Sequence, residues 1–519
     1  MSVRRLPKMA FLLIVGVAAG SLLWLVDSNL GIGWPSNVLR NWQEFGPKPM
    51  HGALVFNPGG FQAVEHPQVY GGMSPLYLYP VYYCAQAFAW SGLGVLPFHL
   101  ILAAGVFWGT CSLLGKGRAA FLFAVAILLS PGYGRWQKLL DPNVIVLLIG
   151  VPYAAILTTR LKQVPLRAVD LLIVVGLTAL FIPLNWTSAW LLAPFGVFLL
   201  LSSGVRRSTA VVLLSLAAVG SIVSVLAAVG AKFGGHATDH SILGGYTWGN
   251  YGYGAGLTSG RAIVRVGFVT IVGLLPVLVL FSFEAWRHFR PPSLKLGLAF
   301  LPLAMVLLEI AGLRNYFGHH PWMSCPVVIV GLVFSYALML DIKPISTPSA
   351  ALEMKLPWAV AGACTLYGLC VLMLFRANEG GHISLAHFVR QNTSRGEWIV
   401  LLRPNDPVLT EFASRLDEQL DRRVLVVDHL SDLPAPPPNQ PMVVLTGVAQ
   451  TGSDIIASEA AGEISGGNSL LLWAGEWFNR HIARRAAGDR IDVGGNHFLY
   501  RPAAWNSANF HSESTAAAQ

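Results

Sequence analysis

The stretch Gly71-Gly72-Met73-Ser74-Pro75-Leu76-Tyr77-Leu78-Tyr79-Pro80 lies near the end of a long connection, residues 27–94, that is rich in Gly, Pro and aromatic residues. This connection follows the first apolar run of the chain and begins with an acid, Asp27. Most other connections before residue 375 are short. We therefore expect the chemistry of this protein to lie at the long connection.

Around this connection the chain is mostly apolar. Its mean hydropathy is +0.56, and hydrophobic residues make up 54% and charged residues 12% of the 519 residues. Soluble domains carry about 25% charged residues, so the composition predicts a polytopic membrane protein. The net charge of +9 is spread over the connections between apolar runs, which is typical of cytoplasmic loops and argues against nucleic-acid binding. The five cysteines lie in apolar runs and predict neither disulfides nor a metal cluster.

The apolar runs predict about eleven membrane-spanning helices. A bilayer core about 30 Å thick needs about 20 apolar residues per helix. The first run is preceded by basic residues as in a signal peptide, but it lacks a small-residue cleavage site, so we expect it to be retained. The predicted spans lie near residues 9–26, 95–114, 119–132, 143–159, 168–184, 187–202, 208–230, 262–283, 294–312, 321–340 and 357–375.

The apolar segment 74–91 decides the orientation of every later span. It is interrupted by Pro75 and Pro80 and is rich in Tyr, so it is either a span or an interfacial helix. If it is interfacial, about fifteen basic residues fall in short cytoplasmic connections and about seven in much longer outside connections, as the positive-inside rule requires. A spanning segment would reverse this distribution. We therefore predict an interfacial helix, a cytoplasmic N-terminus and a C-terminal region on the outside.

From about residue 376 the charges return and the apolar runs become short. Strands that alternate with helices predict a small α/β domain with a mostly parallel sheet. The expected strands are Trp398–Leu402, Val424–Val427, Met442–Thr446 and Ser469–Trp473, and the expected helices are His382–Asn392, Pro407–Leu420 and Glu476–Arg485. The predicted fold class is thus an α-helical polytopic membrane protein (residues 1–375) with a C-terminal α/β soluble domain (376–505) and a disordered tail (506–519).

Two acids stand at the predicted outer surface. Asp27 ends the first span, where a partly desolvated carboxylate can act as a general base; the plainer interpretation is a polar residue that marks the end of the span. Asp141 precedes Pro142 and an apolar run, which is also an ordinary way to cap and start a helix. However, Arg135 and Lys138 lie close to Asp141 in sequence, and two cations at the membrane surface suit the phosphate of a lipid head group.

A short outside loop carries Arg314 and the adjacent pair His319 and His320. Two histidines without a third ligand are weak evidence for a metal, so a phosphate-binding role is the better hypothesis. The alternative is a polar interfacial loop. Other polar residues lie on outside loops that are rich in Gly and aromatic residues: Glu65, His66, His236, Asp239 and His240. These loops would suit a lid that binds a sugar or lipid, and they would equally suit an interfacial segment.

Charge is nearly absent inside the predicted spans, with Glu309 as the main exception. Ion-coupled transporters usually need intramembrane acids or bases, and many contain internal repeats, which we do not detect here. A lipid-linked glycan flippase or transporter is therefore the second hypothesis. A non-catalytic assembly partner is the third.

Taken together, these residues resemble the GT-C superfamily of polyprenyl-phosphate-sugar-dependent membrane glycosyltransferases, over roughly residues 1–340. The similarity is greatest to the bacterial branch with protein O-mannosyltransferase-like and aminoarabinose-transferase-like enzymes. It rests on Asp27 after the first span, and on Ser74-Pro75-Leu76-Tyr77-Leu78, which is similar to the Pro-Pro-Leu-Tyr-Tyr segment of the family. It also rests on Asp141, a second outside acid that follows Ser130-Pro131.

The resemblance implies an inverting hexosyl- or pentosyltransferase at the periplasmic face of a bacterial inner membrane. Its partners would be a polyprenyl-phosphate-linked sugar and a glycan, lipid or protein acceptor. Asp27 would deprotonate the acceptor hydroxyl, and Asp141 would orient the acceptor, or a divalent metal if one is used; no other cofactor is expected. The cations Arg135, Lys138 and Arg314, with His319 or His320, would bind the phosphate, and Tyr77 would lie in the substrate loop. The chain departs from the family pattern in having no Lys before Pro75, unless Lys48 or His66 takes that place.

Overall fold

A computed structural model gives the structure of the chain. The residues that it describes are 34–48, 52–55, 75–88, 96–115, 117–136, 142–181, 184, 188–233, 259–288, 293–312, 317, 321–342, 362–368, 370–371, 388–389, 392–393, 397–402, 423–427, 442–446, 454–459 and 497–501. The chain divides into two units. One consists of Met1–Val26, His51–Leu54 and Tyr70–Leu372, and the other of Asp27–Met50, Val55–Val69 and Met373–Gln519.

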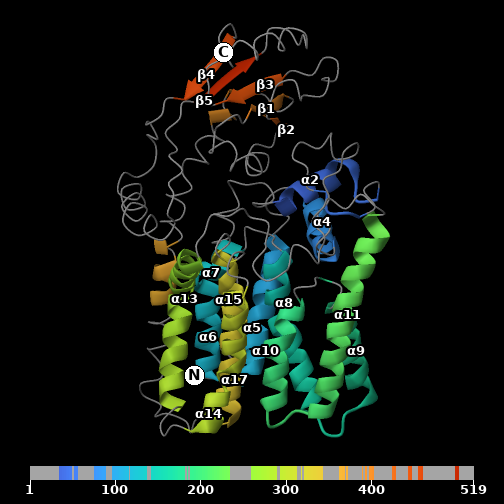
Figure 1. The fold of residues 1–519 in the computed structure, drawn as a ribbon, viewed down its shortest axis with the longest axis vertical. Helices are drawn as coiled ribbons and strands as arrows, with labels where there is room; N and C mark the ends of the chain where they lie inside the picture. The colour runs from blue at the N-terminus through green and yellow to red at the C-terminus, as the bar shows by residue number, and fades with distance from the viewer. Residues whose placement is uncertain are drawn as a thin grey trace. The chain divides into compact units, whose positions relative to one another are not determined.

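The first unit is a bundle of apolar helices (Figure 1). Its elements are η1 (Pro75–Tyr77), α4 (Leu78–Ala87), α5 (Leu96–Leu113), α6 (Arg118–Leu129), α7 (Pro131–Trp136), α8 (Pro142–Leu161), α9 (Ala168–Phe181), α10 (Ser188–Leu201), α11 (Arg207–Phe233), α13 (Ser259–His288), α14 (Leu294–Leu298), α15 (Leu301–Gly312), η4 (Pro321–Met323) and α17 (Ser324–Ile342). Residues 362–368 and 370–371 are also helical. In Figure 1, α7 and α14 lie at opposite ends of this bundle.

The predicted spans between residues 95 and 342 all fall on these helices. Within the described residues, four helices are long and apolar enough to cross a membrane: Leu96–Leu113, Val144–Leu161, Ile263–His288 and Pro321–Ile342. Shorter apolar helices account for the others. The chain is therefore a multi-pass membrane protein. The first predicted span, 9–26, lies outside the described residues.

The predicted span 119–132 is divided at Ser130. α6 ends at Leu129, and Ser130 has an extended backbone (φ −70°, ψ 140°), which is the conformation that a following proline favours. The hydroxyl of Ser130 then accepts a hydrogen bond from the backbone N–H of Tyr133 at 3.2 Å. Ser130 thereby caps α7, and Pro131 occupies the first helical position, where its missing N–H costs nothing.

The segment that was predicted to be interfacial forms η1 and α4. A ten-residue helix is about 15 Å long, half of the roughly 30 Å that a span requires. One face of α4, including Leu78, Val81 and Ala85, is buried, whereas Tyr83 and Phe88 are exposed. This amphipathic character suits an interfacial helix; its position at the membrane surface stays a prediction.

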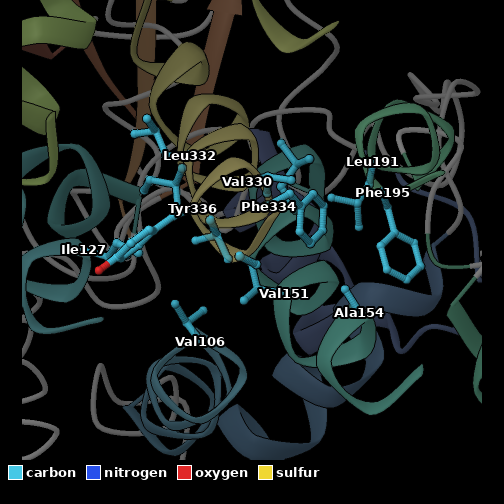
Figure 2. Packing of buried hydrophobic residues seen from close by; sticks show 14 of the residues in the cluster. Val106, Ile127, Val151, Ala154, Leu191, Phe195, Val330, Leu332, Phe334 and Tyr336 are labelled. Carbon is cyan, nitrogen blue, oxygen red and sulfur yellow. The ribbon is translucent and has the colours of Figure 1, made fainter. Parts of the chain in front are cut away.

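α17 is the central helix of the bundle, and nearly all of its residues are buried. It contacts α8, α10, α13 and α15. Aliphatic and aromatic side chains pack together around it (Figure 2). The ring centroid of Phe334 lies 5.5 Å from that of Phe195 and 5.4 Å from that of Phe198, both on α10. On another side, Tyr336 packs edge-on against Phe123 of α6 at 5.2 Å.

α5 and α8 approach each other closely because Gly105 and Gly109 lie between them. A Cβ atom on Gly109 would lie 2.8 Å from the backbone N and Cα of Pro152 in α8, and one on Gly105 would lie 3.5 Å from the ring of Pro152. Small residues four positions apart allow such contacts in membrane helices, where van der Waals packing takes over much of the role of hydrophobic association. The pair of glycines thus sets the register between the two helices.

Polar contacts join the helices at the opposite end from α7. Arg160 of α8 forms an ion pair with the buried Asp170 of α9, with Nη1 and Oδ1 2.6 Å apart. Asp341, at the end of α17, accepts hydrogen bonds from the backbone N–H of Ser203 at 2.7 Å and from the hydroxyl of Ser202 at 3.1 Å. These contacts connect α17 to the segment after α10 without placing charge in the middle of the bundle.

The second unit contains α2 (Trp34–Phe45) and a five-stranded sheet in the order β2-β1-β3-β5-β4. The strands are β1 (Trp398–Leu402), β2 (Arg423–Val427), β3 (Met442–Thr446), β4 (Asp454–Glu459) and β5 (His497–Arg501). β1 pairs in parallel with β2 and β3, whereas β5 pairs antiparallel with β3 and β4. In α2, the side chains of Val38, Leu39 and Trp42 are fully buried at helical spacing.

Three predicted strands of the sheet are confirmed, and the other part of the sheet differs from the prediction. β4 and β5 were not predicted, and their antiparallel pairing makes the described sheet mixed instead of mostly parallel. The predicted strand Ser469–Trp473 and the predicted helix cores around residues 407–420 and 476–485 lie outside the described residues. The α/β character of this region therefore stays a prediction.

The contact between α5 and α8 yields a first testable prediction. Gly109→Leu forces a side chain against the backbone of Pro152, and this backbone cannot move aside. We therefore expect the free energy of unfolding to fall by about 3 kcal/mol, in the upper part of the usual range for overpacking. The measurement is thermal unfolding of the purified protein in detergent. Gly176→Leu in α9 is the control, since a Cβ there meets nothing within 4 Å. Equal stability of the two variants would contradict the close contact.

Candidate functional site

Most of the predicted site residues lie outside the described residues. These are Asp27, Glu65, His66, Lys138, Asp141, His236, Asp239, His240, Arg314, His319 and His320. Arg135 is placed through its backbone, in α7, and Tyr77 is buried in η1. The structure thus describes the helices that hold the predicted loops. The roles of the charged groups stay predictions.

α7 lies close to α13 and to the start of α17 because Gly132 and Gly273 carry no side chains at this contact. A Cβ atom on Gly132 of α7 would lie 2.9 Å from the Cβ and Sγ atoms of Cys325 and 3.1 Å from the carbonyl oxygen of Gly273. A Cβ on Gly273 of α13 would lie 2.8 Å from the same Sγ and 3.2 Å from the ring of Trp322. The backbone of Arg135 is therefore anchored within one turn of this contact.

The loop that carries Arg314, His319 and His320 is anchored at the same place. It leads directly into η4, and η4 contacts α13. Just after η4, the hydroxyl of Ser324 donates to the carbonyl oxygen of Pro321 at 2.6 Å and lies 2.6 Å from the hydroxyl of Thr270 on α13. α7, which contains Arg135, and η4, which directly follows the loop with Arg314, thus both contact one helix, α13. We call the end of the bundle at which α7 and η4 lie the outer end, because the predicted topology places it outside.

η1 and α4 contain the segment that resembles the family motif. η1 contacts α8, the helix that Asp141 directly precedes in sequence. The hydroxyl of Tyr79 lies against the backbone of Gly52, where a Cβ would be only 2.5 Å away, and Gly52 has a φ of +65° that favours glycine. Burial, with a smaller contribution from Tyr83, raises the pKa of Tyr79. Tyr79 therefore stays a neutral hydroxyl at physiological pH.

His99 is a polar residue of the outer end that the sequence analysis missed. It lies in the first turn of α5 and is only 3% exposed. Neither of its ring nitrogens has a hydrogen-bond partner in the part of the chain that the structure describes. The signal in the sequence was weak, because one histidine at the start of an apolar run (Pro97-Phe98-His99-Leu100) looks like an ordinary core residue.

A divalent metal at Asp141 stays an untested alternative. Within the described ranges, no three His, Cys, Asp or Glu side chains lie close enough together to hold a metal ion. Asp141, His319 and His320 are not among those residues.

The fold defines a polytopic helical membrane protein, and comparisons with known proteins identify its architecture. No family model and no curated protein matches the sequence. The chain is similar to the crystal structure of ArnT from Cupriavidus metallidurans bound to undecaprenyl phosphate, with 11% identity and a TM-score of 0.51 over 96% of this chain and 98% of that chain. The apo state of the same protein matches with a TM-score of 0.52, 11% identity and coverage of 95% and 98%.

A third likeness, to the arabinofuranosyltransferase AftD from Mycobacteria, has a TM-score of 0.40 and 15% identity, and covers 95% of this chain and 40% of that chain. This score is too low to bear on the fold. The likeness to ArnT establishes the fold alone, because the identity is only 11%. The chain therefore shares the fold of ArnT over almost its whole length, beyond the residues 1–340 that the resemblance covered.

The anchoring of α7 yields a second prediction. Gly273→Leu should displace α7 and η4 from α13 and expose Cys325, which is fully buried in the wild type. Gly267→Leu, in the same helix, should leave both in place because a Cβ there meets nothing within 4 Å. The measurement is the rate at which Cys325 is alkylated, followed by mass spectrometry of its peptide. An unchanged rate in Gly273→Leu would show that the three-way contact is absent.

Proposed function

We propose that this protein is an inverting glycosyltransferase that moves a sugar from a polyprenyl-phosphate donor to an acceptor hydroxyl at the periplasmic face of a bacterial inner membrane. The observation that carries the proposal is the similarity in fold to ArnT, a protein crystallised with undecaprenyl phosphate, over 96% of this chain. Support comes from the sequence, which places Asp27, Asp141 and several cations in the predicted outside loops.

In the proposed reaction, Asp27 takes the proton of the acceptor hydroxyl as the oxygen attacks the anomeric carbon of the sugar. The bond between that carbon and the phosphate oxygen breaks, and its electron pair leaves with polyprenyl phosphate. One displacement from the face opposite the leaving group inverts the anomeric configuration. Asp27 then releases its proton to water. Asp141 orients the acceptor from its position just before α8.

The leaving group gains negative charge as the bond breaks, so cations near its phosphate lower the barrier. Arg135, Lys138 and Arg314, together with His319 or His320, are proposed to fill this role. Supporting this, the segment after α7 and the loop before η4 both attach to α13, through the contacts of Gly132 and η4. Two cationic segments that share one anchor can be held at a constant separation, which pre-organised charge stabilisation requires.

The test is the release of polyprenyl phosphate from a labelled polyprenyl-phosphate-sugar by the full-length protein in lipid, with Asp27→Asn beside the wild type. We expect Asp27→Asn to reduce release at least about 100-fold, since a general base contributes about 10²–10⁴ in rate. The variant should still insert and bind polyprenyl phosphate. Glu44→Gln, an exposed acid in the same long connection, is the matched control and should be fully active.

Three results would contradict the proposal. Full activity of Asp27→Asn would remove this residue from the reaction. No release with any donor, combined with movement of the labelled lipid between leaflets, would identify a flippase instead. The absence of both activities, with lipid binding retained, would favour the non-catalytic assembly partner.

A further inference from the structure

His99 is buried in the bundle as a polar group without a partner. It is 3% exposed, and both ring nitrogens lack a hydrogen bond within the described part of the chain. A neutral imidazole carries one N–H donor and one acceptor nitrogen, and leaving both unpaired in a dry interior is unfavourable. Unsatisfied buried polar groups are rare in native proteins, and each calls for an explanation such as a missing ligand.

The register of the helices places His99 at the outer end. Gly109 of α5 contacts Pro152 of α8. His99 lies ten residues before Gly109, and Pro142 lies ten residues before Pro152. Ten residues of helix span about 15 Å, so His99 and Pro142 lie at the same level in the bundle. On the antiparallel α6, the thiol of Cys111 contacts the carbonyl oxygen of Ala120 at 3.9 Å. His99 lies twelve residues before Cys111, and Gly132, at the start of α7, lies twelve residues after Ala120. His99 and Gly132 therefore lie at similar levels.

The side chain of His99 is directed into the bundle and toward this end. His99 is seven residues from Val106, so both lie on one face of α5. Figure 2 shows Val106 pointing toward Val151 of α8 and the packed cluster around α17. In addition, helical side chains tilt toward the N-terminus of their helix, which for α5 is the outer end.

Two long helices begin at the level of His99. α8 starts at Pro142 and has 20 residues, and α17 starts at Ser324 and has 19 residues. Because Gly132 contacts Cys325, the first turn of α17 lies at the same level as the start of α7. The N-terminus of a helix carries partial positive charge and favours an anion. The buried imidazole of His99 lies at the same level, and in its neutral form it carries one further N–H donor.

We infer that His99 donates a hydrogen bond to a phosphate oxygen of the lipid-linked donor, which binds at the outer end between the first turns of α5, α8 and α17. This inference rests on the proposed function and names a binding residue for its donor. His99 supplies a neutral donor from the buried part of the bundle, in addition to the cations that the proposed function assigns to the phosphate.

The experiment compares His99→Phe with the wild type as full-length proteins in lipid nanodiscs. It measures the melting temperature and the dissociation constants of polyprenyl phosphate and of polyprenol, which lacks the phosphate. Phe fills the space of the imidazole without its polar atoms, so the melting temperature should not fall. The affinity for polyprenyl phosphate should fall about 10- to 100-fold, as for a lost hydrogen bond to a charged group. The affinity for polyprenol should not change.

Thr110→Val is the matched control. Thr110 lies on the same face of α5, is fully buried, and its hydroxyl also has no hydrogen-bond partner among the described residues. It lies three turns closer to the other end of the helix, so its replacement should leave both affinities unchanged. Equal losses of affinity in Thr110→Val and His99→Phe would show a general packing effect and overturn the inference.

The amide variants His99→Asn and His99→Gln test the hydrogen bond itself. Each keeps an N–H donor, and at least one should recover part of the affinity that His99→Phe loses. If neither recovers any affinity, or if His99→Phe binds polyprenyl phosphate as tightly as the wild type, the inference is overturned while the proposed function stands. If the wild type does not bind polyprenyl phosphate, the proposed function itself fails, and the inference fails with it.

Discussion

The close contact between Gly109 and Pro152 is the constraint on which the outer end of the bundle depends. Apolar helices in a membrane gain little from leaving lipid for protein, so their association relies on close packing and a few polar contacts. Two glycines let the backbones of α5 and α8 meet, and this contact fixes their relative height. That height in turn places His99 beside the start of α8, so the packing in the middle of the bundle determines which polar groups meet at its surface.

α13 has a similar role on the other side of α17. Gly273 receives α7, Thr270 meets Ser324, and η4 packs nearby. Through these contacts, one helix holds the segments from which the two proposed phosphate-binding loops extend. Charged loops repel one another and gain little from burial, so their separation must be set by the apolar helices beneath them. The proposed site thus combines acids and cations on loops with a base of close contacts between helices at Gly132 and Gly273.

The spans were predictable because a long apolar run has one stable arrangement in a bilayer, a helix that satisfies its own backbone hydrogen bonds. The predicted strands β1, β2 and β3 followed from short apolar runs with sharp boundaries. β4 and β5 were missed because their composition is not typical of strands: Asp454–Glu459 has an acid at each end, and His497–Arg501 is bounded by polar residues. These segments form strands because they pair with neighbouring strands, an effect that local composition does not reveal. The sequence indicated the acids, the cations and Tyr77 of the candidate site, but it did not indicate His99. The significance of His99 depends on its burial and on the lack of a hydrogen-bond partner among the described residues.

The sequence by itself determined that this protein is a multi-pass membrane protein, because hydropathy and the length of apolar runs act locally and leave few alternatives. It also determined which acids and cations are available in the predicted outer loops, and its motifs resemble those of the GT-C superfamily. Only the tertiary structure decided which helices touch, at what height, and therefore that α7 and η4 share α13 and that His99 faces the bundle interior. Those outcomes depend on close contacts between residues such as Gly132 and Cys325, nearly 200 positions apart in the chain, which no local pattern specifies.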